Sequence, residues 1–280
     1  MHVLDPPRGA ASMRVHLAVY ARGLRRHSTY RAATAAGALT NAVFGAINAM
    51  VLLSVFEARP QINGYDAGDA VTQVFVGQML LTVTMVISVA PSLDLAEHIR
   101  TGEIATDLLR PLSLQGWWLS QDLGRATFGL LFRGAPVFAV GLILFDATLP
   151  GGVGDALAFL VSVALAALVG FGLRYLYSLS GFWILDTRGV WMVTGLIGPI
   201  AAGMLLPLAL FPTAIGDTLR LLPWASMVQI PTEILLGKDT LPGGGAFGGL
   251  ALQAFWAVVL LALGAWLSTV ATRRVVVQGG

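Results

Sequence analysis

Long apolar segments alternate with short polar connections along this chain. Six segments are long enough to cross a bilayer, which takes about 20 mostly apolar residues in a helix; they cover residues 32–56, 70–91, 126–145, 156–184, 190–211 and 246–270. Apolar residues run continuously within each segment instead of alternating with polar ones, as they would in a transmembrane strand. The pattern therefore predicts an all-α membrane protein with six transmembrane helices.

The segment before the first span has the pattern of an amphipathic helix. At about 100° per residue, one face of residues 13–31 collects apolar side chains: Met13, Leu17, Tyr20 and Leu24. The opposite face collects basic ones: Arg14, Arg22, Arg25 and Arg26. We predict a helix lying on the inner leaflet with its arginines toward anionic headgroups, the alternative being a helix packed on a soluble core. Residues 1–31 would form a tail and this helix, and residues 32–275 the membrane domain.

Basic residues gather on one side of the predicted topology. With the N-terminus inside, the inner side carries twelve: Arg8, Arg14, Arg22, Arg25, Arg26, Arg31, Arg100, Arg110, Arg125, Arg188, Arg273 and Arg274. The outer side carries three: Arg59, Arg220 and Lys238. Because cytoplasmic loops carry the excess of basic residues, both termini are predicted to be cytoplasmic.

Composition agrees with a polytopic membrane protein and narrows the chemistry. Hydrophobic residues make up 56% of the chain, charged residues 11%, and the mean hydropathy is +0.77. The net charge of +2 is too small to indicate nucleic-acid binding. The absence of cysteine excludes disulfides and thiolate metal ligands. The four histidines lack metal-ligand spacing, and no Ser/His/Asp set is placed on one face, so we predict neither a metal site nor catalysis by this chain.

A charged segment, residues 93–124, interrupts the apolar sequence between the second and third spans. Its titratable residues are Asp94, Glu97, His98, Arg100, Glu103, Asp107, Arg110 and Asp122. Charges in hydrocarbon cost several kcal/mol each, so this segment must connect two spans on one side of the membrane.

The pattern of the charged segment predicts two short helices separated by Gly102. Leu95 and Ile99 share one apolar face, and Ile104 and Leu108 share another. Acid–base pairs at helical spacing support the turns: Glu97 with Arg100, and Asp107 with Arg110. Pro111 ends the second helix. We expect the apolar sides to rest on the membrane domain and the charges to face a soluble partner.

Residues 98–114 read HIRTGEIATDLLRPLSL, which resembles the first cytoplasmic loop of ABC-2-type permeases, the membrane subunits of bacterial ABC exporters. The shared positions are a basic residue, Gly-Glu-Ile and Leu-Leu-Arg-Pro-Leu: Arg100, Gly102, Glu103, Ile104, Leu108, Leu109, Arg110, Pro111 and Leu112. In that family the loop carries a coupling helix that docks on a separately encoded ATPase. The resemblance implies five ATPase-contact residues, a solvated loop face being the alternative: Glu97, Arg100, Glu103, Asp107 and Arg110.

The chain carries no ATP-binding motif of its own. A P-loop needs Gly-x-x-x-x-Gly-Lys-Ser/Thr. The only lysine, Lys238, follows Gly237, but Thr232 stands in place of the first glycine and Asp239 comes after the lysine. ATP and Mg²⁺ would therefore be bound by the partner ATPase, and this chain would not be an enzyme.

The resemblance also implies a dimeric exporter in the bacterial inner (plasma) membrane. The substrate would be an amphipathic or hydrophobic molecule such as a drug, as in multidrug efflux, a peptide or a lipid-like molecule. ABC-2 permeases pair about their first and fifth spans, so Gly195 and Gly198 would lie at the dimer seam unless they serve packing within one subunit. The second permease is either an identical or a related chain.

Two arginines, Arg133 and Arg174, lie inside the predicted third and fourth spans. Buried arginines are costly, so contact with an anionic lipid-like substrate or a lipid is one hypothesis. Snorkelling to the headgroups and pairing with a neighbour are the alternatives. No acid lies inside any predicted span, which argues against a proton-driven secondary transporter, as does the lack of a visible internal repeat. A membrane-embedded enzyme or scaffold is disfavoured because no polar cluster appears in the spans.

The external segment 212–245 is too apolar for a solvated loop. We predict one or two short helices interrupted by Pro223 and Pro231. They would correspond to the re-entrant helices of the resembled family, acting as a lid over an exit path or as a packing cap.

Overall fold

The computed structural model describes residues 10–88, 93–184, 186–239 and 243–278, and these residues fold almost entirely into helices. In chain order the elements are α1 (Ala10–Ser28), α2 (Arg31–Ala58), α3 (Ala67–Thr84), α4 (Leu95–Thr101), α5 (Ile104–Asp107), α6 (Leu114–Gly129), η1 (Leu130–Gly134), α7 (Ala135–Leu144), α8 (Val153–Leu179), η2 (Ser180–Phe182), α9 (Arg188–Ala201), η3 (Leu208–Leu210), α10 (Thr213–Arg220), η4 (Ala225–Met227), α11 (Gln229–Leu235) and α12 (Gly245–Gln278). The predicted all-α class is confirmed. The N-terminal tail, residues 1–9, lies outside the described residues.

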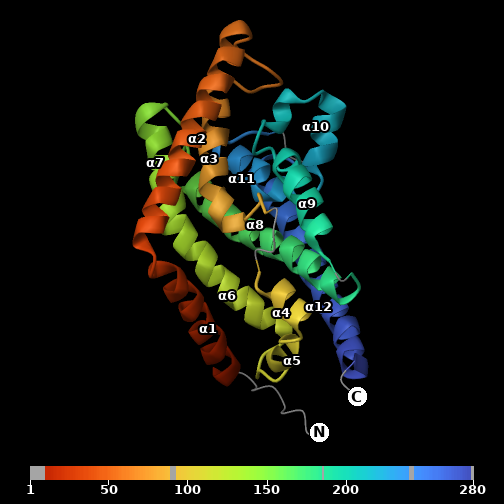
Figure 1. The fold of residues 1–280 in the computed structure, drawn as a ribbon. Coiled ribbons are helices and arrows are strands. Elements are labelled where there is room, and N and C mark those ends of the chain that lie inside the picture. Colours follow the sequence, from red (N-terminus) through yellow and green to blue (C-terminus); the bar gives the residue numbers. More distant parts are fainter. Residues whose placement is uncertain (1–9, 89–92, 185, 240–242, 279–280) are drawn as a thin grey trace.

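The described chain forms an elongated bundle with two distinct ends (Figure 1). Helices α1, α4 and α5 and the C-terminal end of α12 lie at one end, and α10 lies at the other. This arrangement places the predicted interfacial helix and the charged segment on the same side of the bundle, as the distribution of basic residues requires.

Four helical segments are long and apolar enough to cross a membrane: Arg31–Ala58, Leu114–Leu144, Val153–Phe182 and Gly245–Arg273. They correspond to the predicted first, third, fourth and sixth spans. The other two predicted spans contain shorter helices, so the count of six is not confirmed. Helix α3 ends where Met85 adopts a left-handed conformation, and α9 has only 14 residues and contains Pro199. The predicted end of the second span at Pro91 lies outside the described residues.

The third span differs most from its prediction. Its helix begins at Leu114 instead of near residue 126, with Ser113 accepting a hydrogen bond from the Gly116 amide as its cap. The connection before it therefore covers residues 93–113 instead of 93–124. Helices α6 and α7 are joined through the π-helical turn η1. Pro136 explains this turn, because proline has no N–H to donate to the carbonyl four residues earlier.

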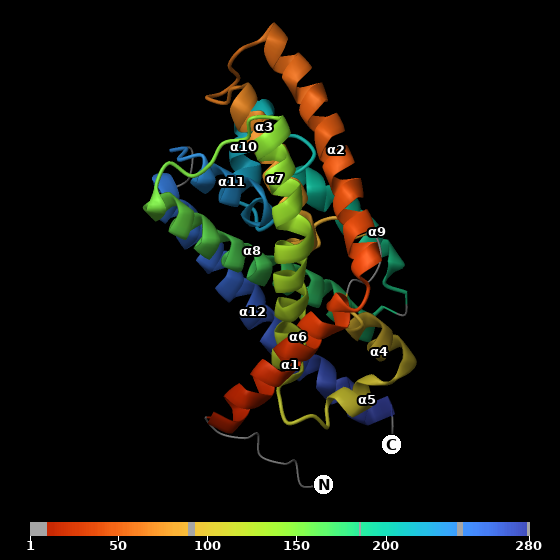
Figure 2. The same cartoon turned by 90° about the vertical axis from the view of Figure 1, so that its left-hand side faces the viewer.

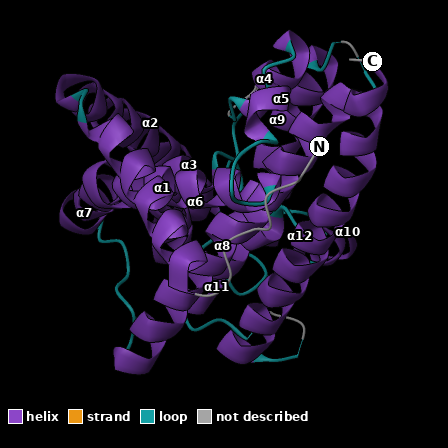
Figure 3. Cartoon of the chain, turned by 90° about the horizontal axis from the view of Figure 1, so that it is seen from below, coloured by secondary structure: helices purple, strands orange, loops and turns teal. Residues whose placement is uncertain are grey.

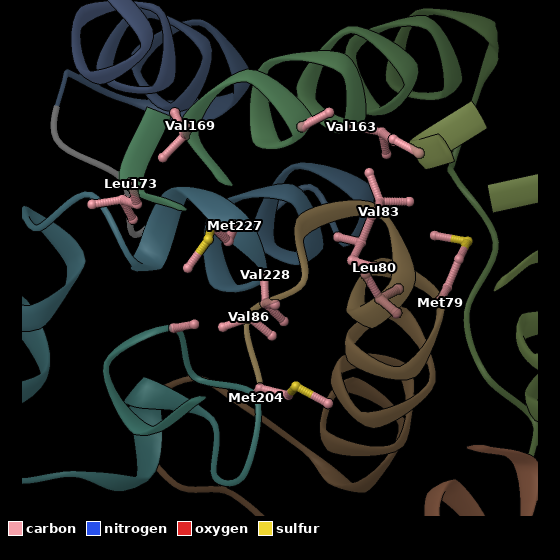
Figure 4. Packing of buried hydrophobic residues seen from close by; sticks show 14 of the residues in the cluster. Met79, Leu80, Val83, Val86, Val163, Val169, Leu173, Met204, Met227 and Val228 are labelled. Carbon is pink, nitrogen blue, oxygen red and sulfur yellow. The ribbon is translucent and has the colours of Figure 1, made fainter. Parts of the chain in front are cut away.

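Helix α3 is the centre of the bundle and is buried along almost its entire length. Its apolar side chains, including Leu80 and Val83, pack with Leu173 of α8 and with Met227 and Val228 near α11 (Figure 4). The first turn is fixed by a capping box in which Asp66 and Asp69 each accept from the other's backbone N–H. Within residues 212–239, the chain returns into the core through α11, while α10 stays at the end of the bundle opposite α1.

Helix α1 packs along most of the length of α6 (Figures 1 and 2). The packing is close because glycine residues of one helix lie against the backbone of the other. A Cβ at Gly124 of α6 would overlap the Tyr20 carbonyl of α1. His16 Nδ1 also lies 2.7 Å from Ser120 Oγ. The predicted helix is therefore present, but its contact with α6 runs along one side of the predicted apolar face, leaving Met13 and Leu17 exposed.

Candidate functional site

The charged segment folds as the two short helices α4 and α5, separated by Gly102 with φ +82°. Leu95 and Ile104 are buried against Tyr175 and Leu179 of α8 and against Trp118 of α6. The predicted apolar contact with the membrane domain is therefore present. Leu108, predicted to share the face of Ile104, is instead exposed, because α5 ends at Asp107 before Pro111 is reached.

Asp107 holds the second short helix in place. Its carboxylate is fully buried and lies 2.9 Å from His98 Nδ1 and 2.7 Å from Arg110 Nη2. The Arg110 guanidinium in turn lies 4.0 Å above the Trp117 ring. We define Asp107, His98 and Arg110 as the Asp107 clamp. Asp107 and Arg110 were predicted as ATPase contacts, and the structure places them within the segment, Asp107 being inaccessible to a partner.

The outward surface of α4 and α5 carries the other three predicted contacts, Glu97, Arg100 and Glu103. Arg100 donates two hydrogen bonds to Glu97, at 2.9 and 2.5 Å. These bonds lower the pKa of Glu97, so its carboxylate stays charged at neutral pH. Leu109 is 73% exposed beside them. Leu109 was not among the predicted contact residues, although two adjacent leucines before a proline cannot both face the core.

A buried ion cluster lies above the charged segment, where α6, α8 and α3 meet. Arg174 donates to both carboxylate oxygens of Asp122, at 3.1 and 2.7 Å, and Arg125 donates to the same carboxylate at 2.7 Å. The carbonyls of Thr82 and Val83, at the C-terminal end of α3, accept from Arg125. We call Asp122, Arg125 and Arg174 the inner ion cluster.

The inner ion cluster shows that one prediction made from the sequence, the placement of Asp122 in a loop, is wrong. Asp122 was assigned to a loop, but it lies inside the span-length helix Leu114–Leu144 and is buried. The prediction that no acidic residue lies inside a membrane span is therefore wrong. Arg174 makes its contacts with Asp122 and the Gly170 carbonyl, so pairing with a neighbour accounts for its burial.

Arg133 and the two seam glycines also make contacts within the chain. Arg133 donates to Asn41 Oδ1 at 3.0 Å, and its guanidinium lies against Gly37 of α2. Gly195 and Gly198 are on the buried face of α9. The exposed face of α9 is formed by other residues: Met192, Val193, Leu196, Ile197 and Ile200.

A second buried polar cluster, which was not predicted from the sequence, lies toward the end of the bundle that carries α10. Glu233 of α11 is fully buried, and its Oε1 accepts from Tyr65 Oη at 3.2 Å, Gln229 Nε2 at 2.7 Å and Arg220 Nε at 3.0 Å. Gln229 also accepts from Gln73 of α3 at 2.8 Å. This outer cluster ties α10 and α11 to α3.

The polar sites of the described chain are ion pairs, hydrogen-bonded clusters and the exposed charged surface of α4 and α5. Among the described residues, no group of three or more His, Cys, Asp or Glu side chains could hold a metal ion.

The comparisons with known proteins identify the family of the chain. The model of the ABC-2 family transporter proteins matches residues 42–279, which include the charged segment and all four span-length helices except the start of the first. Comparisons with curated proteins and with solved structures found no match. The matched region covers most of the sequence, and the chain therefore belongs to the ABC-2 transporter family.

Proposed function

We propose that the chain is the permease subunit of an ATP-driven exporter, with α4 and α5 as the element that couples it to a separate ATPase. The observation that carries this proposal is the two-sided construction of these helices. Leu95 and Ile104 anchor them on α6 and α8, and Glu97, Arg100 and Glu103 face outward. Leu109 adds an exposed apolar side chain that a docked partner would bury.

The same construction gives a route for coupling. ATP binding would close two ATPase subunits and displace α4 and α5. Motion of these helices would pass to α8 through the packed side chains of Leu95 and Leu179. From α8 it would pass to α3 through the inner ion cluster, in which Arg174 and Arg125 share the Asp122 carboxylate and Arg125 bonds the end of α3. ATP and Mg²⁺ would stay on the ATPase.

The permease would work as a dimer, with the exposed apolar faces of α2 and α9 at the seam. The exposed apolar residues of α9 include Leu196 and Ile197, and the exposed apolar residues of α2 include Phe44 and Ile47. Both an identical and a related second permease fit this surface. The apolar bundle suits export of an amphipathic or hydrophobic substrate from the inner membrane of a bacterium.

Co-purification tests this function. The tagged permease would be extracted gently from its native host, and bound proteins would be identified by mass spectrometry. We expect a stoichiometric ATPase with a P-loop. The double variant Glu103→Lys/Leu109→Asp should lose the ATPase while inserting normally into the membrane.

The matched control is Glu57→Lys, the same charge reversal on an exposed residue at the opposite end of the bundle. It should keep the ATPase. A permease that purifies alone and transports in liposomes without ATP would instead indicate a secondary transporter.

A further inference from the structure

A cleft lies between α1 and α4, with the first turns of α6 as its floor. It has a volume of about 240 Å³, and the residues that matter for its chemistry are Arg22, Arg26, Asp94, Arg110 and Trp118. Figure 3 shows the ribbons of α1 and α6 close together, with α4 and α5 across from them. The cleft continues along the outward face of α1, past Arg25.

The charges of the cleft favour an anion. Arg26 pairs with Asp94 at 2.7 Å, and Arg110 is balanced by the buried Asp107. Arg22 has no ion pair or side-chain hydrogen bond within the described part of the chain, and its positive charge is left uncompensated. The neighbouring Arg25 adds a second uncompensated charge at the mouth.

Trp118 provides a second and independent indication of a ligand. It is 3% exposed and lines the cleft, and its indole N–H has no acceptor among the described residues. Indole is a donor only, as is guanidinium. A ligand that satisfies both groups must offer acceptor oxygens and negative charge, which is the chemistry of a phosphate group.

The position of the cleft indicates where such a phosphate comes from. Arg26 lies five residues before Arg31, where the first span-length helix begins, so the cleft is at the depth of the headgroups. Trp117 and Trp118 suit that depth, because indole rings settle at the interface. Met13 and Leu17 of α1 are exposed and would be buried by neighbouring acyl chains.

We propose that this cleft binds the headgroup phosphate of an anionic phospholipid, which would hold α1 against the charged segment. The cleft takes Arg110 from the charged segment but is not lined by Glu97, Arg100, Glu103 or Leu109, so the proposal does not depend on export or on the identity of the partner.

Lipid binding to the purified permease in detergent tests the proposal. Phosphatidylglycerol and phosphatidylcholine would be titrated separately, and bound lipid would be counted by native mass spectrometry. We expect preferential binding of phosphatidylglycerol. Arg22→Gln should weaken it about fivefold, the effect of about one arginine near a headgroup. Trp118→Phe, which removes the N–H and keeps the ring, should weaken it about threefold, as for one lost hydrogen bond.

Arg14→Gln is the matched control, since it removes one charge from α1 at an exposed position that does not line the cleft. Its phosphatidylglycerol affinity should equal that of the unchanged protein, and the melting temperature of every variant would show that it is folded.

Equal losses for Arg14→Gln and Arg22→Gln would overturn the proposal, since binding would then follow the net charge of α1 alone. Displacement of the lipid by glycerol 3-phosphate at equal affinity would assign the cleft to a free phosphate compound instead of a lipid. Displacement by the ATPase would assign it to an acidic segment of the partner.

Discussion

Arg174 of α8 donates two hydrogen bonds to the carboxylate of Asp122 on α6, and both side chains are almost completely buried. The residues lie 52 positions apart in the sequence. Their pairing fixes the position of α6 on α8 directly above the charged segment. Arg125 extends the same ion cluster to the end of α3, so three helices meet at one carboxylate.

Arg174→Met should destabilise the protein strongly. Removing one partner of a buried ion pair leaves the other charge uncompensated and costs about 3–5 kcal/mol; the remaining Arg125 reduces this cost toward the lower value. Thermal unfolding in detergent would measure the effect. Arg188→Met removes an exposed arginine and should leave the melting temperature unchanged. Equal melting temperatures for the two variants would show that the inner ion cluster contributes nothing to stability.

Asp107→Ala should release α5 without unfolding the bundle. The substitution removes the hydrogen-bond partner of His98 and the ion-pair partner of Arg110. A hydrogen bond to a charged group contributes about 1.5–3 kcal/mol. Hydrogen–deuterium exchange of residues 95–110 should accelerate, while exchange in α8 stays slow. Glu97→Ala, at an exposed position of α4 whose carboxylate pairs with Arg100 and lies outside the Asp107 clamp, is the control and should leave the exchange of α5 as it was.

Gly124→Ala should weaken the packing of α1 on α6. The added Cβ would overlap the Tyr20 carbonyl, and overpacking of this kind costs about 1–3 kcal/mol. Gly154→Ala is the matched control, since it places a methyl group in open space near the start of α8, and helix propensity favours alanine by about 1 kcal/mol. Limited proteolysis should cut α1 faster only in the first variant. Equal protection of both would contradict the close helix contact.

The features that depend on local sequence pattern could be predicted from the sequence. The span-length apolar segments and the break at Gly102 follow from periodicity and backbone preference, and both are present. The features that could not be predicted from the sequence depend on long-range contacts. Asp122 looked like a loop residue because its arginine partner lies in another helix, and Asp107 looked exposed because charged residues usually are. The burial of Glu233 could not be predicted from periodicity, because two of its hydrogen-bond partners, Tyr65 and Arg220, lie outside α11.

Glu233→Ala should destabilise the outer end of the bundle. The substitution leaves Arg220 and Tyr65 without their buried acceptor, and we expect a loss of about 3–5 kcal/mol. Asp217→Ala removes the other carboxylate that pairs with Arg220, but that side chain is 63% exposed and should contribute about 0–1 kcal/mol. Denaturant or thermal unfolding of the two variants would show which of the two carboxylates contributes more to the free energy of unfolding. A larger effect of Asp217→Ala would show that the surface pair, not the outer cluster, holds α10.

Cysteine cross-linking tests the dimer seam, and the chain suits it because it contains no native cysteine. Leu196 is 68% exposed on α9, and Leu157 is 58% exposed on α8. In a homodimer that pairs through α9, Leu196→Cys should form a covalent dimer under mild oxidation in membranes, because only thiols in close reach can form a disulfide. Leu157→Cys has a similarly exposed apolar position on another helix and should stay monomeric on a denaturing gel. If a related chain is the natural partner, Leu196→Cys should form the covalent dimer only when that chain carries a cysteine at its own seam. Cross-linking of Leu157→Cys in place of Leu196→Cys would move the seam to α8.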